Sequence, residues 1–271
     1  TIEGRIRLRG TFSLKQTDVT WAATRNTGRV ITEVDADIQV WIEVENRPTL
    51  LRFNEQVLGA EFGKAYPHVM VIDGNDDRGI DVGVMSRYPI RSIKSHVDDL
   101  NPNGQRTFSR DCPEYLIDLP GGKTILILPN HFKSKRGGNT AAMQARRKAQ
   151  ADRAHAIAKA ALTERQYVLI AGDLNDTPDV AAFSALFEDG FVDVLDHPSY
   201  PTDRPGTFNT GTAPNKIDYL IMSPKLRAKL TDTGIERRGS FHPNTWEPFD
   251  TVTNKTEEAS DHHLVWADFS I

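Results

Sequence analysis

Short apolar segments of strand length recur along the chain, and this feature restricts the possible folds more than any other. Each combines β-branched or aromatic residues with flanking polar or turn-forming residues, the pattern of a buried or half-buried strand. The predicted strands cover residues 37–44, 68–72, 80–86, 115–119, 124–130, 167–171, 216–222 and 264–269. Because those between residues 68 and 130 follow one another with no helical signal between them, we expect antiparallel sheets rather than a regular strand–helix alternation.

Helical signals are fewer than strand signals. Residues 140–163 are rich in Ala with interspersed Arg, Lys and Gln, which gives the strongest helix propensity in the chain. Asn46 is expected to cap a second helix, with Pro48 in its first turn. Weaker helices are predicted around Val30, Ile31 and Val34 and over residues 178–187. Few helices and many strands favour two packed sheets covered by helices, in one domain over residues 1–271.

The composition excludes several classes of protein. Hydrophobic residues make up 38% and charged residues 26%, which is ordinary for a folded domain. No apolar segment approaches the roughly 20 residues of a membrane-spanning helix, so we expect no transmembrane segment. A net charge of −4 gives no overall attraction to polyanions, which would need a local basic patch or a metal. Cys112 is the only cysteine, which excludes an intrachain disulfide but leaves the compartment open.

Polar residues follow the predicted strand at residues 167–171. Gly172 lets the backbone approach a ligand closely, and alternation along an extended chain places Asp173 and Asn175 on one side. An anionic acceptor and an amide would then face the same point. The alternative is an Asx turn that closes the strand, which is the commonest use of Asp and Asn at such places.

A second polar group follows residues 124–130. His131, Lys133 and Ser134 combine an imidazole, a cation and a hydroxyl, which suits a phosphate. The imidazole could donate a proton to a phosphoryl oxygen or a leaving group, and the lysine supplies positive charge. A solvated basic loop with an incidental histidine explains the same residues equally well.

Three more strand ends carry chemically active residues. Asp218 begins one strand and His262 precedes another, so the two would form an acid/base dyad if they touch. Glu43 ends an apolar strand, and a buried carboxylate there would need a partner or a metal, whereas an exposed one would need neither. Such oxygen ligands suit Mg²⁺, with Mn²⁺ or Ca²⁺ as alternatives, and metal-assisted phosphoester hydrolysis is the chemistry that fits them.

The ordered set of motifs resembles the endonuclease/exonuclease/phosphatase superfamily, which includes deoxyribonucleases, abasic-site endonucleases, sphingomyelinases and inositol polyphosphate 5-phosphatases. Each motif is short, and their order along the chain carries the resemblance. The motifs are Glu43-Val44-Glu45-Asn46, Arg78-Gly79-Ile80-Asp81, Phe108-Ser109-Arg110, Asn130-His131-Phe132-Lys133-Ser134, Gly172-Asp173-Leu174-Asn175, Ile217-Asp218-Tyr219 and Ser260-Asp261-His262.

The resemblance implies an α+β fold, a four-layer αββα sandwich of the deoxyribonuclease I type, with the active site at one end of the paired sheets. It also implies the roles of the site residues. Metal would be bound by Glu43 and Asp261, and catalysis would fall to His131, Asp173, Asn175, Asp218 and His262. Substrate would be held by Arg110, Lys133 and Ser134, and Asp81 is a further candidate for orienting His131.

One departure from the family concerns an Asn at the end of a first strand, which helps to bind metal or phosphate. We do not assign that role to Asn26, because it precedes Glu43 too closely and falls at the expected helix. We therefore expect the first strand to lie before Thr1, and this form of the chain to be less active than a longer one.

Nucleic acid is the favoured substrate because Lys133, Lys135 and Arg136 lie beside His131, and Arg146, Arg147 and Lys148 could extend that basic patch. The alternatives are a phosphatase of lipid or small-molecule phosphates, for which Trp246 and Phe249 are the only indication of an exposed apolar loop, and a binding protein without catalysis. No obligate protein partner is inferred.

Overall fold

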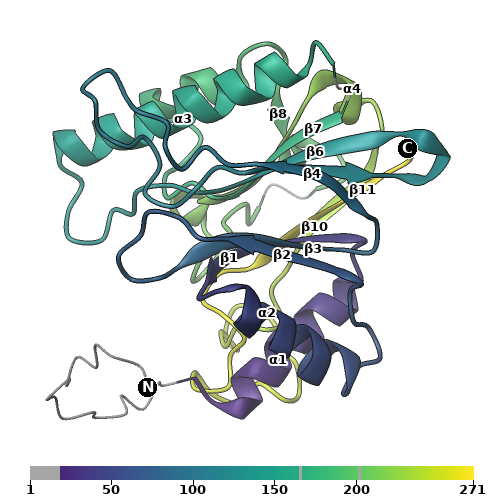
Figure 1. Ribbon diagram of the computed structural model, residues 1–271. Coiled ribbons are helices and arrows are strands. Elements are labelled where there is room, and N and C mark those ends of the chain that lie inside the picture. The colour runs from purple at the N-terminus through teal and green to yellow at the C-terminus, as the bar shows by residue number, and fades with distance from the viewer. Residues whose placement is uncertain (1–18, 165–166, 201–202) are drawn as a thin grey trace, which may run out of the picture.

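The computed structural model describes residues 19–164, 167–200 and 203–271. Figure 1 shows these residues stacked in layers: α3 (Ala141–Ala161) covers one sheet, a second layer of strands lies beneath it, and α1 (Trp21–Val34) and α2 (Arg47–Phe53) cover the far side. The predicted αββα sandwich is confirmed. No helix in these ranges has both the length and the apolar character required to cross a bilayer.

The larger sheet has six strands and supports most of the site. Their order is β4 (Ile90–Lys94), β5 (Glu114–Asp118), β6 (Thr124–His131), β7 (Tyr167–Asp173), β9 (Asp218–Met222) and β8 (Val192–Asp193). Only β6 and β7 run parallel, because α3 returns the chain between them; the other pairs are antiparallel.

The second strand layer comes in two pieces. One is a three-stranded antiparallel sheet in the order β1 (Ile38–Val44), β3 (Asp81–Ser86) and β2 (His68–Ile72), and the other is the antiparallel pair β10 (Leu230–Glu236) and β11 (Leu264–Phe269). Within the described ranges, no strand joins β1 to β11. The first strand that the sequence analysis places before Thr1 lies outside these ranges.

The helices begin and end where local chemistry favours it. The Thr140 hydroxyl accepts the N–H of Met143 and caps α3, and the Asn46 side chain accepts the N–H of Thr49 and caps α2 as predicted. α1 ends at Asp35, whose left-handed backbone terminates the helix. The remaining helical segments are the π-helical turn Asn54–Gly59, α4 (Pro224–Arg227) and the 3-10 turns Pro120–Gly122, Ala181–Phe187, Val194–Asp196 and Ala213–Asn215.

Two features differ from the sequence prediction. The helix predicted over residues 178–187 is a 3-10 helix over Ala181–Phe187. The strands β4, β8 and β10 were not predicted, since β4 and β10 carry several exposed polar side chains and β8 has only two residues. Such strands lack the apolar alternation that identifies a strand in sequence.

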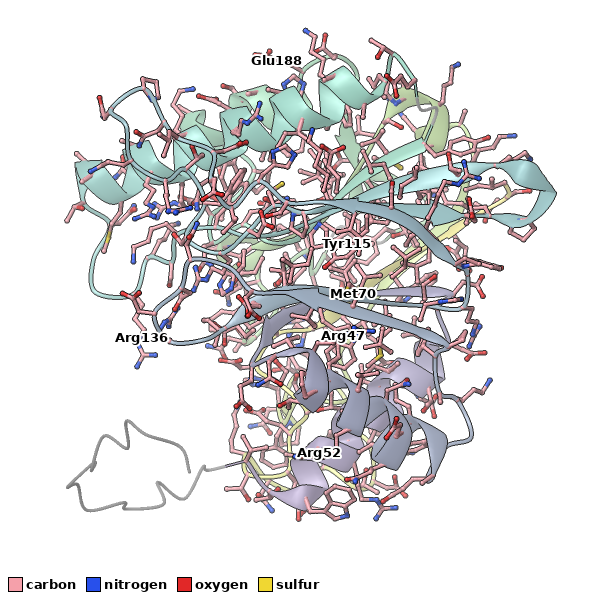
Figure 2. The ribbon with its side chains drawn as sticks, viewed as in Figure 1. Arg47, Arg52, Met70, Tyr115, Arg136 and Glu188 are labelled. Carbon is pink, nitrogen blue, oxygen red and sulfur yellow. The ribbon has the colours of Figure 1, made fainter. Side chains whose placement is uncertain are left out.

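Three apolar clusters hold the layers together. Leu128, Ile170 and Ala154 belong to the cluster between the six-stranded sheet and α3. The cluster between the two strand layers includes Tyr115, with Met70 packed against it, and Figure 2 shows both side chains in that space. A third cluster, which contains Leu50, Leu58 and Met85, joins the three-stranded sheet to α2 and the turn that follows it.

Candidate active site

The register of three neighbouring strands brings three of the predicted residues side by side. His131 at the end of β6 is paired with Asp173 at the end of β7, and Asp173 is paired with Asp218 at the start of β9. Because paired residues on adjacent strands point to the same side of a sheet, these side chains gather at one edge. They line a cleft of about 1670 Å³ together with the other predicted site residues, Glu43, Arg110, Lys133, Ser134, Asn175, Asp261 and His262.

Asp173 and Asn175 interact directly. The backbone N–H and the side-chain amide of Asn175 donate to the two carboxylate oxygens of Asp173, each at 2.8 Å. Asn175 adopts a left-handed backbone with φ of 59°, which Asn tolerates better than most residues. The Asx turn considered from the sequence is therefore present, and it holds both side chains at the wall of the cleft.

The environment of Asp173 opposes its negative charge. Burial raises the pKa of this carboxyl above its usual range, and the neighbouring Asp218 carboxylate raises it further. The two carboxylates and His262 offer ligand atoms within 4.8 Å of one another. Clustered carboxylate oxygens of this kind fit a hard divalent cation.

Asp218 and His262 form the predicted dyad. Nδ1 of His262 lies 3.0 Å from both carboxylate oxygens of Asp218. The hydroxyl of Thr207 donates to Asp218 at 2.6 Å and accepts its backbone N–H, so it fixes the carboxylate. Thr207 is fully buried and was missed from the sequence, because a lone Thr in a loop carries no signal of such a role.

Replacing Asp218 by Asn should lower the pKa of His262. Burial alone would lower that pKa, but the charge and hydrogen bonds of Asp218 outweigh burial and raise it to about 10. Because the pKa of His262 is raised in the folded protein, its pairing with Asp218 stabilises the fold fully below about pH 6.5, the ordinary histidine pKa. This stabilisation is lost as the pH rises through the pKa of His262 in the folded protein. NMR titration of metal-free protein should show the change, and an unaltered His262 titration in Asp218→Asn would contradict it.

His131 is almost completely buried at the base of the cleft. Its Nε2 lies 3.5 Å from the Asp173 carboxylate and 3.9 Å from Glu43. Burial, reinforced by Arg110, lowers the pKa of His131 to about 3, so the ring is neutral at physiological pH. Asp81 does not approach this ring and instead accepts the backbone N–H of Gly74, so its suggested role in orienting His131 is not supported.

The two residues predicted to bind metal lie on either side of the gap in the second strand layer. Glu43 has a left-handed backbone with φ of 60° at a bulge in β1, and its side chain is 59% exposed. Asp261 is exposed directly before β11, and its carbonyl accepts the N–H of Asn209. Both carboxylates line the cleft and remain available for a ligand.

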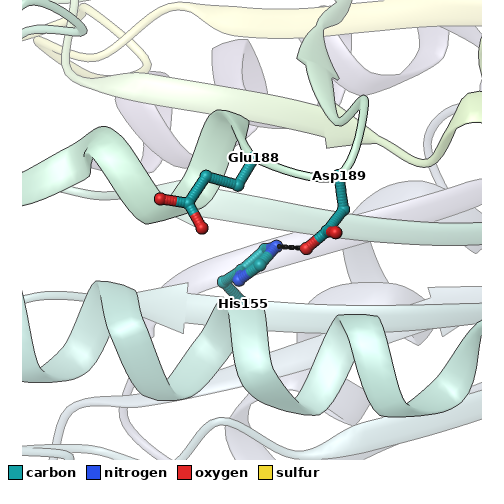
Figure 3. Close-up of side chains that lie close together, drawn as sticks. All are labelled: His155, Glu188 and Asp189. Atoms are coloured by element: carbon teal, nitrogen blue, oxygen red, sulfur yellow. Dashed lines mark ion pairs between the residues drawn. The ribbon is translucent and has the colours of Figure 1, made fainter.

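A second group of potential metal ligands lies away from the cleft. His155 on α3 points toward Glu188 and Asp189 (Figure 3), and its Nε2 lies 3.2 Å from the Asp189 carboxylate. Lys159 also pairs with Asp189, at 3.0 Å. Because an ammonium group already neutralises this carboxylate, the cleft is the better candidate for a metal centre.

Basic side chains line the cleft beside the acidic cluster. Arg110 is buried and paired with Asp76 at 3.0 Å, and Asp76 also binds the exposed Arg78. These two arginines therefore form one network, of which only Arg110 was predicted to bind substrate. Lys133 and Ser134, which were predicted to hold substrate, are half-buried on the cleft wall.

Arg147 does not extend the basic surface as suggested from the sequence, because it is completely buried. Its Nε binds Asp176 at 3.0 Å and one terminal nitrogen donates to the carbonyl of Lys133 at 3.1 Å. The other terminal nitrogen donates to Asn139. Arg147 thus anchors the loop that carries Lys133 and Ser134 to α3.

Replacing Arg147 by Met should lower the free energy of unfolding by about 3 kcal/mol, because the buried carboxylate of Asp176 would keep only the partly exposed Lys135 as a cationic partner. Urea denaturation measures the loss. Arg146→Met is the matched control, since Arg146 is exposed on the same helix. Equal stabilities of the two variants would contradict the anchoring role.

The chain is similar to known proteins in both sequence and fold. A family model described as the Endonuclease/Exonuclease/phosphatase family matches residues 23–262. None of the curated proteins matches the chain.

Several solved structures share the fold. An endonuclease/exonuclease/phosphatase from Beutenbergia cavernae matches with a TM-score of 0.62 and 20% identity, over 89% of this chain and 64% of that protein. Truncated TDP2 from Caenorhabditis elegans matches with a TM-score of 0.61 and 16% identity, over 90% and 89% of the two chains. The 3′ phosphatase NExo from Neisseria, solved with a product DNA hairpin, matches with a TM-score of 0.60 and 14% identity, over 94% and 96%.

Proposed function

The chain belongs to the endonuclease/exonuclease/phosphatase family of hydrolases, and we propose that it hydrolyses phosphodiester bonds of nucleic acid with the help of a divalent metal, Mg²⁺ in the first instance. The observation that carries the proposal is the meeting of His131, Asp173 and Asp218 on three adjacent strands, with His262 bound to Asp218. This arrangement combines carboxylate ligands with donors for phosphoryl oxygens in one cleft.

The protein groups have separable roles in this mechanism. Asp173 and Asn175 orient the attacking water and a phosphoryl oxygen, because their mutual hydrogen bonds fix both side chains. Asp218 keeps His262 protonated through Nδ1, which leaves Nε2 to stabilise negative charge on the phosphorane-like transition state. Neutral His131 and cationic Arg110 contact the phosphate or its leaving group. A metal bound by Glu43 and Asp261 would supply positive charge and lower the pKa of a coordinated water.

The charge of the cleft wall supports a polyanionic substrate. Lys133, Arg136 and Arg146 line the cleft and have no carboxylate partner among the described residues. Figure 2 shows Arg136 extending away from the body of the molecule, on the loop that follows β6. Unpaired cations that continue outward from the catalytic groups suit a substrate with several phosphates.

The suggested apolar loop for a lipid substrate is not supported. Phe249 is buried against Val30 and Val252, and Arg29 and Arg238 lie over its ring. Trp246 donates its indole N–H to the carbonyl of Ser240. Both aromatic residues thus have structural roles, which removes the observation that favoured a lipid phosphatase.

The test is metal-dependent turnover across a panel of substrates: plasmid DNA, RNA, bis-p-nitrophenyl phosphate and phosphoinositides. We expect cleavage of DNA or RNA with Mg²⁺, loss of that cleavage in EDTA, and recovery when Mg²⁺ is returned in excess. Preferential release of phosphate from phosphoinositides would show that the protein is a lipid phosphatase rather than a nuclease. Retention of DNA or RNA without turnover of any substrate would indicate a binding protein.

A further inference from the structure

One buried lysine lies behind the active site and does not face the cleft. Lys216 stands two residues before Asp218, is only 5% exposed and is not among the residues that line the cleft. Its ammonium group lies 2.7 Å from the carboxylate of Asp193 at the end of β8, and this carboxylate is buried as well. Because Lys216 cannot reach a substrate in the cleft, any effect it has on the reaction must act through another residue.

The ammonium group of Lys216 has three contacts inside the protein. It binds the Asp193 carboxylate, and it donates a hydrogen bond to the backbone carbonyl of Asp218. Its nitrogen also lies 3.7 Å from the ring centroid of Tyr219, which is a cation–π contact. An ammonium group has three N–H donors, so these contacts are sufficient to satisfy it. Lys216 thus connects the end of β8 to the start of β9, the strand that carries Asp218.

The contact with Lys216 completes the restraints on the backbone of Asp218. The hydroxyl of Thr207 accepts the backbone N–H of Asp218 at 2.9 Å and donates to its carboxylate at 2.6 Å. Lys216 holds the carbonyl on the other side of the same Cα atom. Because the direction of a side chain depends on its backbone, fixing both peptide groups fixes where the carboxylate meets Nδ1 of His262.

Stability alone does not explain a lysine at this position. Removing two charges from water costs free energy that their attraction only partly returns, and well-packed apolar residues often hold two strands equally well. An apolar pair in place of Lys216 and Asp193 could not donate a hydrogen bond to the carbonyl of Asp218. The ammonium group supplies that donor, and the Asp193 carboxylate balances its charge.

We propose that Lys216 is a positioning residue for the hydrolysis: it fixes the backbone of Asp218 so that the Asp218 carboxylate stays directed at His262. This inference rests on the proposed function, in which Asp218 acts through His262. Loss of the Lys216 contact should loosen this dyad without changing the cleft wall that binds substrate.

Lys216→Met tests the proposal, because methionine has a similar length and no N–H donor. The first measurement is the ¹H NMR resonance of the Nδ1–H of His262, in metal-free protein without substrate and below about pH 6.5, where the ring is protonated. We expect this resonance to move upfield, because the hydrogen bond to Asp218 weakens. The second measurement is phosphodiester turnover by the folded variant, in which kcat should fall about tenfold or more at a nearly unchanged KM.

Two further variants serve as controls. Lys225→Met should change neither the resonance nor kcat, since Lys225 is exposed on α4 and does not line the cleft. Asp193→Asn removes the ion pair, but an amide oxygen at this position can still accept a hydrogen bond from Lys216. The contact of Lys216 with the Asp218 carbonyl then remains, and the resonance of His262 should stay close to its position in the unmodified protein.

Three results would overturn the proposal. They are an unchanged resonance in Lys216→Met, an unchanged kcat in that variant, and equal upfield shifts in Lys216→Met and Asp193→Asn, which would show that the ion pair only holds the strands together. If Lys216→Met fails to fold, its combination with Asp193→Asn answers the same question, because it removes the unpaired buried carboxylate. Absence of turnover by the unmodified protein would contradict the proposed function alone, since the resonance reports on Lys216 without substrate.

Discussion

Asp173→Asn should lower kcat for phosphodiester hydrolysis by about 10³-fold, because it removes the negative charge that orients water and balances a cation. The same change should slightly raise the stability of the metal-free protein. Burial and the Asp218 carboxylate raise the pKa of Asp173 in the folded protein. At pH values above the pKa that this group has in the unfolded chain, ionised Asp173 therefore lowers the stability of the fold. An uncharged amide at this position removes that loss. Steady-state kinetics and metal-free thermal unfolding measure the two effects.

Asp179→Asn is the matched control, since Asp179 is exposed on the loop that follows and does not line the cleft. It should leave both kcat and the unfolding temperature unchanged. If Asp173→Asn lowered activity and stability together, its effect would be structural rather than catalytic. Full turnover by Asp173→Asn would remove this carboxylate from the mechanism.

Gly172→Ala should lower the free energy of unfolding by about 3 kcal/mol or more and should abolish turnover. Gly172 has φ of +134°, and a Cβ atom there would lie 2.0 Å from the carbonyl oxygen of Asn130. That carbonyl belongs to β6, so relief of the clash would displace His131 and separate it from Asp173. Urea denaturation and the Mg²⁺-dependent assay measure the two effects.

Gly104→Ala separates the clash from the effect of the backbone angle. Gly104 has φ of +74°, but an added Cβ would meet no atom within 4 Å. This control should lose only about 1 kcal/mol, the cost of a left-handed backbone for alanine. Similar losses in both variants would mean that the strands separate easily at Gly172, contrary to the close packing described.

Much of the fold could be predicted because its central strands are strongly apolar. β6 and β7 have buried side chains at nearly every position, and this pattern is visible in sequence. β4 and β10 were missed because packing against neighbouring strands, rather than their own alternation, determines them.

The site could be predicted as a set of residues but not as a set of contacts. Polar residues at the ends of apolar strands identified Asp173 and Asp218, and strand pairing made them neighbours. Thr207 and Asp76 act by holding Asp218 and Arg110 in place, and no local pattern distinguishes them from other polar loop residues. The prediction that Arg147 extends the basic surface was wrong, because the sequence does not show which face of a helix is buried.

The parallel pairing of β6 and β7 also has a consequence for how the protein could change. The loop that carries Lys133 and Ser134 joins β6 to α3 within the crossover between the parallel strands β6 and β7. Arg147 fixes the start of this loop through the carbonyl of Lys133. Insertions near Arg136 can therefore lengthen or recharge the rim of the cleft without altering the register of His131 and Asp173. The rim of the cleft around Arg136 can therefore change in length and charge while the paired ends of β6 and β7 stay fixed.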